Sequence, residues 1–229
     1  DPAHGPISHA ISVLGMPGLT AYAGMTKYGK PQPSETVFIS AASGAVGSVA
    51  GQLGRLAGAR VVGSAGSDPK VTHIKDKLRF NNAFNYKTTE IGAALDEHCP
   101  DGIDVYFDNV GGETLDAVLA RLNEGARLAI CGQISQYDVR SDGEQFGLRN
   151  FPNILRKHAT VTGFSVRDNM DIFDDFLTRM AALMKAGDVV YEEDIVEGID
   201  AAPAAFIGMM QGDNVGKRLV RVGDDPALD

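Results

Sequence analysis

Short apolar runs alternate with segments of helical spacing along most of this chain. Residues 36–40 (TVFIS) are apolar and β-branched, and residues 46–57 carry apolar side chains at helical intervals. Residues 60–64 (RVVGS) repeat the strand pattern, and Asp68 followed by Pro69 predicts an N-cap and the first position of another helix. The pattern therefore predicts two successive strand–turn–helix units.

The alternation continues to about residue 186. Further strands are expected at 83–85, 105–107, 126–131 and 159–164, and helices within 89–98, over 114–122 and over 171–186. Repeated units of this kind form a doubly wound parallel sheet with helices on both faces, and ligands bind at the carboxyl ends of its strands. The predicted fold class is α/β of the Rossmann type.

Both ends of the chain depart from this alternation. Residues 1–15 carry no clear element, whereas 195–198 and 217–222 have the pattern of strands flanking a helix at 201–211. We interpret the two terminal segments as parts of a second structural unit.

The turn after the first predicted strand carries the most chemistry. Small side chains let the backbone approach phosphate groups, and free N–H groups at the start of the helix face the negative charge. The residues expected to bind a dinucleotide pyrophosphate there are Ser43, Gly44, Ala45, Val46 and Gly47. Ala42 stands where GxGxxG has its first glycine, so a merely tight turn is the alternative. Gly51 is expected to allow close packing of the helix against a strand.

The end of the second predicted strand favours NADP(H) over NAD(H). Enzymes that prefer NAD usually carry a carboxylate there for the ribose hydroxyls, whereas this chain has residues 64–67 (SAGS). Lys70 is placed to pair with a 2′-phosphate, and Ser67 to donate a hydrogen bond to it. Asp68 is a carboxylate near this strand end and so argues against NADP(H), but a role as N-cap of the next helix explains it. The alternative for Lys70 is a solvated surface lysine.

Composition and charge narrow the possible partners. Of 229 residues, 44% are hydrophobic and 22% charged, as is typical of folded soluble domains. The net charge of -9 disfavours nucleic acid and anionic membrane surfaces. No apolar run approaches the ~20 residues of a membrane span, and the start lacks the features of a secretory signal. We therefore expect no nucleic acid or membrane partner, and a cytoplasmic location.

Cysteines and histidines are few and scattered. With only Cys99 and Cys131 there is no disulfide framework, and the 5 histidines lack the spacing of metal ligands. We expect reduced thiols and no metal site. Cys131 is interpreted as a small buried side chain without a covalent role.

Six runs distributed along the chain carry a family resemblance. They are GMPGLTAYAGM, ISAASGAVGSVAGQL, AFNYK, YFDNVGGETLD, ICGQISQY and PAAFIGMMQGDNVGKRLV. Together they resemble the zinc-independent medium-chain dehydrogenase/reductases, in particular the branch of alkenal double-bond reductases, curcumin reductase and leukotriene/prostaglandin reductase. The resemblance implies NADPH-dependent reduction of the carbon–carbon double bond of small α,β-unsaturated ketones or aldehydes. It also implies a homodimer joined at sheet edges, for which residues 159–164 supply an edge.

The resemblance further implies a division into domains. Relatives place a partly barrel-like substrate domain before the cofactor domain. Residues 1–15 are then the trailing edge of that domain, 16–190 the Rossmann domain, and 191–229 a segment that returns towards the substrate domain. Most of the substrate domain lies outside this sequence, so the chain is expected to be a fragment or to be naturally short, with apolar positions of the tail exposed, repacked or covered by another subunit.

The family's cofactor contacts carry over position by position. The 2′-phosphate end is assigned to Gly66, Ser67, Lys70 and Tyr86; the neighbourhood of the cofactor to Asn109 and Val110; the nicotinamide side to Cys131, Gly132, Gln133, Ile134, Ser135, Tyr137, Phe164, Ser165 and Val166; and a contact from the C-terminal tail to Asn214. Several have a structural alternative: Tyr86 as a strand-end side chain, and the two asparagines as turn residues.

Tyr137 is the candidate catalytic residue. Hydride transfer leaves an enolate-like charge on the substrate oxygen, and a donor held there stabilises that charge. The Tyr137 hydroxyl is expected to bond this oxygen and help protonate the enol, a role that the ribose 2′-hydroxyl of the cofactor is expected to share. A tyrosine that only caps its loop is the alternative. Three other functions stay open: a quinone reductase, a zinc alcohol dehydrogenase of the same superfamily, and a non-catalytic NADPH-binding module.

Overall fold

A sheet of 6 parallel strands, in the order β3-β2-β1-β4-β5-β6, forms the centre of the molecule. The strands are β1 (Thr36–Ile39), β2 (Arg60–Ala65), β3 (Asn82–Asn85), β4 (Ile103–Asp108), β5 (Leu122–Ile130) and β6 (Thr160–Gly163). The computed structural model describes residues 5–137 and 146–225. It confirms the doubly wound fold, with the strand order reversing between β1 and β4.

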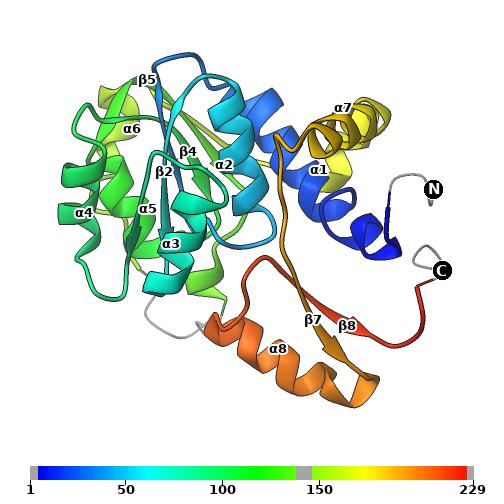
Figure 1. Ribbon diagram of the computed structural model, residues 1–229. Coiled ribbons are helices and arrows are strands. Elements are labelled where there is room, and N and C mark those ends of the chain that lie inside the picture. Colours follow the sequence, from blue (N-terminus) through cyan, green and yellow to red (C-terminus); the bar gives the residue numbers. More distant parts are fainter. Residues whose placement is uncertain (1–4, 138–145, 226–229) are drawn as a thin grey trace.

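Helices cover both faces of this sheet (Figure 1). One face carries α1 (Met16–Ala23) with the π-helical η3 (Gly24–Gly29), α2 (Gly47–Leu56), α3 (Asp68–Asp76) and α7 (Phe173–Ala186); the other carries α4 (Ile91–His98), α5 (Gly112–Leu119) and α6 (Pro152–Arg156). Along β1, Val37 and Ile39 enter the first core and Phe38 enters the second. Burial on both faces explains why the strands are continuous apolar runs.

A second, smaller sheet follows the Rossmann part. It consists of β7 (Glu193–Glu197) and β8 (Lys217–Arg221), paired in parallel and connected by η6 (Ile199–Ala201) and α8 (Ala202–Gln211). The Gln52 side chain on α2 holds the preceding segment, because its Nε2 donates to the carbonyl of Val190 at 2.7 Å and its Oε1 accepts from the same residue's N–H at 2.8 Å. This unit is therefore fixed to the main sheet through α2.

The N-terminal segment packs beside this smaller unit. His9, in the short helix η2 (Ile7–Ile11), meets the ring of Tyr191 edge-on, with the ring centroids 4.7 Å apart. The described ends of the chain lie on the same side of the molecule (Figure 1). Segments from both ends of the sequence are thus neighbours; their assignment to a second domain stays a prediction.

Several element boundaries differ from the predictions. The helix predicted over 114–122 ends at Leu119, because Leu122 already pairs with Ile103 of β4. Residues 1–15, predicted without an element, contain η2. The sequence pattern also missed α1, whose residues are buried almost all round, so that no polar face marks it as a helix.

Two predicted local contacts are wrong. Ser67 occupies the N-cap position of α3, and the carboxylate of Asp68 instead accepts a hydrogen bond from the side-chain amide of Asn85 at 2.8 Å. Gly51 packs against an aromatic ring rather than directly against a strand, since a Cβ at this position would lie 1.8 Å from Cζ of Phe80. The ring fills the space between the helix and the sheet.

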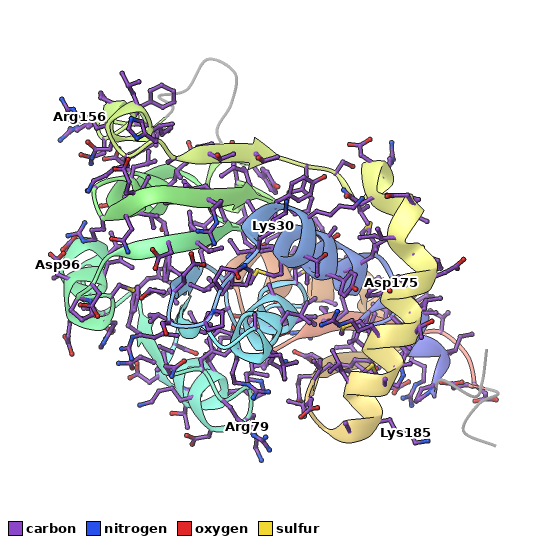
Figure 2. All side chains as sticks on the ribbon, turned by 90° about the horizontal axis from the view of Figure 1, so that it is seen from above. Lys30, Arg79, Asp96, Arg156, Asp175 and Lys185 are labelled. Atoms are coloured by element: carbon purple, nitrogen blue, oxygen red, sulfur yellow. The ribbon has the colours of Figure 1, made fainter. Side chains whose placement is uncertain are left out.

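Charged side chains mark the periphery of the molecule. Figure 2 shows Asp96 on α4, Arg156 on α6 and Lys185 on α7 extending away from the sheet. Asp96 forms a two-bond ion pair with Arg121, with N···O distances of 2.6 and 2.8 Å. Across residues 5–137 and 146–225, none of the helices has the combination of length and apolar character needed to span a bilayer.

Candidate functional site

The turn between β1 and α2 presents its backbone at the carboxyl edge of the sheet. A Cβ on Gly47 would lie 2.5 Å from the carbonyl oxygen of Ala41, so this turn requires glycine at position 47. Helix α2 begins at Gly47, and no hydrogen bond from within the described residues occupies the amides of Val46 and Gly47. Free amides at the positive end of a helix dipole suit an anion, and this group of amides is called the anion cradle below.

Ala42 replaces the usual first glycine of the motif without opening the turn. The residue is fully buried, and its N–H donates to the carbonyl of Ser64 at 2.9 Å. Opposite its methyl group lies Gly63 of β2, where a Cβ would be only 2.7 Å from the Cβ of Ala42. The glycine that the motif lacks is therefore compensated by a glycine on the neighbouring strand.

The carboxyl ends of β2 and β3 gather basic and hydroxyl groups. A Cβ on Gly66 would lie 3.0 Å from the hydroxyl of Tyr86 and 3.2 Å from Cε of Lys87. Lys70 is only 9% exposed, so the solvated-lysine alternative is wrong. Burial lowers the pKa of Lys70, and the positive charge of Lys87 lowers it further. Two ammonium groups beside a phenol suit a phosphate, and sequence reasoning missed Lys87 although it follows the predicted Tyr86 directly.

Asp108 organises the turn at the point where the strand order reverses. Its Oδ1 accepts from the N–H groups of Val110 and Gly111, both at 2.8 Å, and from the hydroxyl of Tyr106 at 2.7 Å. Burial nonetheless raises the pKa of the Asp108 carboxyl, and its Oδ2 has no partner within the described residues. The prediction missed Asp108, although a carboxylate at the end of an apolar strand was a visible signal.

Asn109 connects the ends of two central strands. Its side-chain Nδ2 donates to the carbonyl of Ser40 at 2.7 Å, and its N–H donates to the hydroxyl of the same serine at 3.0 Å. Because Ser40 follows β1 and Asn109 follows β4, these two bonds connect the strand ends at the point where the strand order reverses. Asn109 thus has a structural role at the end of β4, and its contact with the cofactor stays a prediction.

The loop after β5 rests on the turn after β4. Ile134 donates its N–H to the carbonyl of Asn109 at 3.2 Å, and the Ser135 hydroxyl donates to the carbonyl of Val110 at 2.7 Å. This loop contains the single turn η4 (Ile134–Gln136). Tyr137 is 63% exposed, and its hydroxyl oxygen accepts the N–H of Gln133 at 3.3 Å. Tyr137 therefore caps its own loop, and its catalytic role stays a prediction.

Cys131 and Phe164 lie at the ends of β5 and β6 with their side chains in apolar surroundings. Burial raises the pKa of the Cys131 thiol to about 12, so the thiol is protonated at neutral pH. The ring of Phe164 stacks on Tyr28 with a centroid distance of 4.8 Å. Ser165 caps η5 (Val166–Ile172) by accepting the N–H of Arg167 at 3.3 Å.

The segment between α8 and β8 returns to the same edge. The N–H of Gly216 donates to the carbonyl of Ser43 at 2.8 Å, within an isolated parallel bridge between Gly216 and Gly44. Asn214 donates its Nδ2 to the carbonyl of Gly216 at 2.8 Å. The ammonium of Lys70 donates to the carbonyl of Gly212. The tail thus reaches the glycine-rich turn, and the contact of Asn214 with the cofactor stays a prediction.

All of these groups lie where the strands of a doubly wound sheet end, which is where such sheets bind nucleotides. No cluster of three or more His, Cys, Asp or Glu side chains with metal-binding geometry occurs in the part of the chain that the structure describes. The strand order and the helices on both faces place the chain in the class of doubly wound α/β domains. The family model described as zinc-binding dehydrogenase matches residues 45–186, more than half of the chain, and the chain belongs to this family.

Named relatives narrow the comparison. The chain is 45% identical over 218 residues to 2-alkenal reductase (NADP(+)-dependent) of Nicotiana tabacum, covering 95% of this chain and 63% of that enzyme. CurA from Vibrio vulnificus, crystallised with NADPH, superimposes with a TM-score of 0.89 at 39% identity, covering 95% of this chain and 65% of that one. Escherichia coli quinone oxidoreductase complexed with NADPH, at 20% identity and a TM-score of 0.75, shares the fold. The chain therefore spans a little under two thirds of the length of these relatives.

Proposed function

We propose that this chain is the cofactor-binding part of an NADP-dependent reductase that reduces the carbon–carbon double bond of α,β-unsaturated ketones or aldehydes. The observation that carries the proposal is the carboxyl edge of the sheet. There the anion cradle of α2 follows β1, the basic groups follow β2 and β3, and the loop bearing Tyr137 follows β5, all at the same edge of the sheet. The alkenal reductase from tobacco and the NADPH complex of CurA support the same assignment.

The residues at this edge fit a 2′-phosphorylated dinucleotide. The free amides of Val46 and Gly47 suit the pyrophosphate. The ammonium groups of Lys70 and Lys87 and the hydroxyl of Tyr86 suit the 2′-phosphate, which as a dianion binds best where more than one cation faces it. Strand β2 is followed by Gly66 and Ser67 rather than by an Asp or Glu. NADP(H) therefore fits this site better than NAD(H).

The bound reduced nicotinamide supplies the hydride. The chain itself orients the reactants and transfers the proton. In this proposal the Tyr137 hydroxyl donates a hydrogen bond to the substrate oxygen as negative charge develops there, and then transfers its proton to this enolate oxygen, which gives the enol. The enol takes up a proton from water at its α-carbon and returns its oxygen-bound proton to the Tyr137 phenolate. The N–H of Gln133 already bonds the Tyr137 oxygen and leaves its hydrogen free for this purpose. A donor held in this way contributes about 3 kcal/mol to the stability of a transition state.

Titration of the 229-residue chain with NADPH and NADH, side by side in a calorimeter, tests the cofactor assignment. We expect NADPH to bind about a hundredfold more tightly, since one ion pair with a desolvated partner is worth about 3 kcal/mol. Equal affinities would contradict the role of Lys70. An assay of the full-length enzyme with an alkenal, a quinone and a primary alcohol tests the reaction, and turnover of the quinone alone would favour the quinone reductase alternative.

We also propose that two copies of the protein associate along β6. This strand is the last in the sheet, and Val161 within it is 42% exposed. Next to it, Phe151 and Leu155 line a hollow of about 560 Å³, and Leu155 is 79% exposed. An apolar, unpaired edge of this kind supports pairing with a second copy. Sedimentation of Val161→Lys should show monomers where the parent chain sediments as a dimer; identical sedimentation of both would remove the edge from the assembly.

A cytoplasmic location is part of this proposal. Cys99 and Cys131 are both free cysteines, as is usual in a reducing compartment. Fractionation of cells that produce the full-length protein tests the location, and recovery in a secreted fraction would contradict it.

A further inference from the structure

The segment of residues 212–216, here called the strap, connects two parts of the proposed cofactor site, the glycine-rich turn and the adenosine end. At one end, Gly216 donates its N–H to the carbonyl of Ser43 in the glycine-rich turn at 2.8 Å. At the other end, the carbonyl of Gly212 accepts from the ammonium of Lys70. Figure 1 shows the chain rising from α8 towards the six-stranded sheet before it turns into β8. One short piece of backbone is therefore held by both proposed phosphate-binding groups.

The charge of Lys70 is only partly balanced. Its pKa is lowered by burial and by Lys87, and this lowering is offset in part by Asp213 and Asp194. Asp194 is already paired with Arg218, with an N···O distance of 3.0 Å, and Lys70 forms no ion pair within the described residues. The Gly212 carbonyl at the end of α8 adds a partial negative charge of at most about half a unit. A buried ammonium in this state gains stability when a dianion arrives beside it.

We propose that Lys70 couples recognition of the 2′-phosphate to the position of the strap, by binding the phosphate while it keeps the carbonyl of Gly212. An ammonium has three donors, so it can satisfy both partners at once. The phosphate favours the charged form of Lys70, and a charged donor makes the stronger bond to the carbonyl.

The strap carries Asn214, which is predicted to contact the cofactor. A phosphate bound at the adenosine end therefore fixes a residue further along the site. Lys70 acts here as a positioning residue as well as a ligand, and the inference rests on the proposed function because it takes Lys70 to bind the 2′-phosphate.

Hydrogen exchange of the 229-residue chain measures this coupling without any turnover. The probes are adenosine 2′,5′-bisphosphate and adenosine 5′-monophosphate, each at saturation, because they differ only in the 2′-phosphate. The amides of Asp213 and Gly216, which bond the carbonyls of Gly208 and Ser43, report on the strap. We expect the bisphosphate to slow their exchange about threefold or more and the monophosphate to leave it unchanged.

Three variants separate coupling from simple attraction of the phosphate. Lys70→Gln removes the charge and should abolish the slowing even when the bisphosphate saturates the site. Lys70→Arg keeps a charged donor and should restore it. Lys87→Gln is the matched control, because Lys87 faces the same end of the site without a bond to the strap; it should weaken binding and retain the slowing at saturation.

The outcomes of this experiment discriminate between the two proposals. Slowing that persists in Lys70→Gln, or exchange in the parent chain that is unchanged or faster with bound bisphosphate, overturns the coupling and leaves the cofactor assignment intact. Equal affinity of the parent chain for the two nucleotides overturns the cofactor assignment and the coupling together.

Discussion

The two ends of the proposed cofactor site are built in different ways. At the adenosine end, Lys70 stands on a helix and Tyr86 and Lys87 directly follow a strand, so regular elements place the charged and hydroxyl groups. At the nicotinamide end, Tyr137 belongs to a loop that backbone bonds hold to the turn after β4. This difference predicts that substitutions at the adenosine end change cofactor affinity and choice, whereas substitutions at the nicotinamide end change the rate of the reaction.

The glycine-rich turn lies between these ends, and its loss is expected to have the largest effect. Gly47→Val places a Cβ 2.5 Å from the carbonyl oxygen of Ala41, so the turn must open and the amide cradle is lost. We expect no detectable NADPH binding and a loss of about 3 kcal/mol in the free energy of unfolding. Calorimetry and urea denaturation measure the two effects. Gly223→Ala, at a position where a Cβ meets nothing within 4 Å, is the control; retained binding in Gly47→Val would contradict the cradle.

Asp108 supports the turn on which the nicotinamide end rests, and its replacement should come next in size. Asp108→Ala leaves the N–H groups of Val110 and Gly111 without their acceptor, at an expected cost of about 2 to 3 kcal/mol in the free energy of unfolding. Asp108→Asn keeps an acceptor of the same shape, and its free energy of unfolding is expected to stay close to that of the parent chain. Denaturation midpoints that are equal for the two variants would show that these bonds contribute little.

The stability of the chain is also expected to depend on pH through Asp108. Burial raises the pKa of the Asp108 carboxyl in the folded chain, so the folded state binds this proton more tightly than the unfolded state does. The stabilisation is complete at acid pH and is lost as the pH rises through the folded-state pKa. The free energy of unfolding of the parent chain relative to that of Asp108→Asn should therefore fall from acid towards neutral pH. If the difference between the two is constant with pH, Asp108 does not bind a proton more tightly in the folded state.

The sequence predicts the parts of this comparison that depend on local patterns. The strands and the glycine-rich turn could be located because apolar β-branched runs end at small residues in the sequence itself. The bond between Lys70 and Gly212 could not, since 142 positions separate them and only the packing of α8 brings them together. Helix α1 was missed for a related reason: burial on all sides removes the periodicity that identifies a helix.

Tyr137→Phe tests the nicotinamide end by itself. Removing the hydroxyl deletes the proposed donor and the acceptor of the Gln133 N–H, while the adenosine end is untouched. We expect kcat of the full-length enzyme to fall about 100-fold with the Kd for NADPH unchanged. An unchanged kcat would mean that the tyrosine only caps its loop. A fall in kcat together with a rise in the Kd for NADPH would mean that the two ends are not separable as proposed.

Tyr86→Phe makes the smallest change at the adenosine end and isolates one hydroxyl. Tyr86 is 50% exposed, and its hydroxyl lies beside Gly66 and Lys87. A single exposed hydrogen bond to a phosphate is worth about 1 kcal/mol, so the Kd for NADPH should rise about fivefold while the Kd for NADH stays the same. An equal loss for both nucleotides would mean that the ring supports the end of β3 rather than the 2′-phosphate. Lys70 and Lys87 remain in this variant, and we propose that they provide most of the preference for NADPH. Complete loss of this preference in Tyr86→Phe would instead assign it to the phenol.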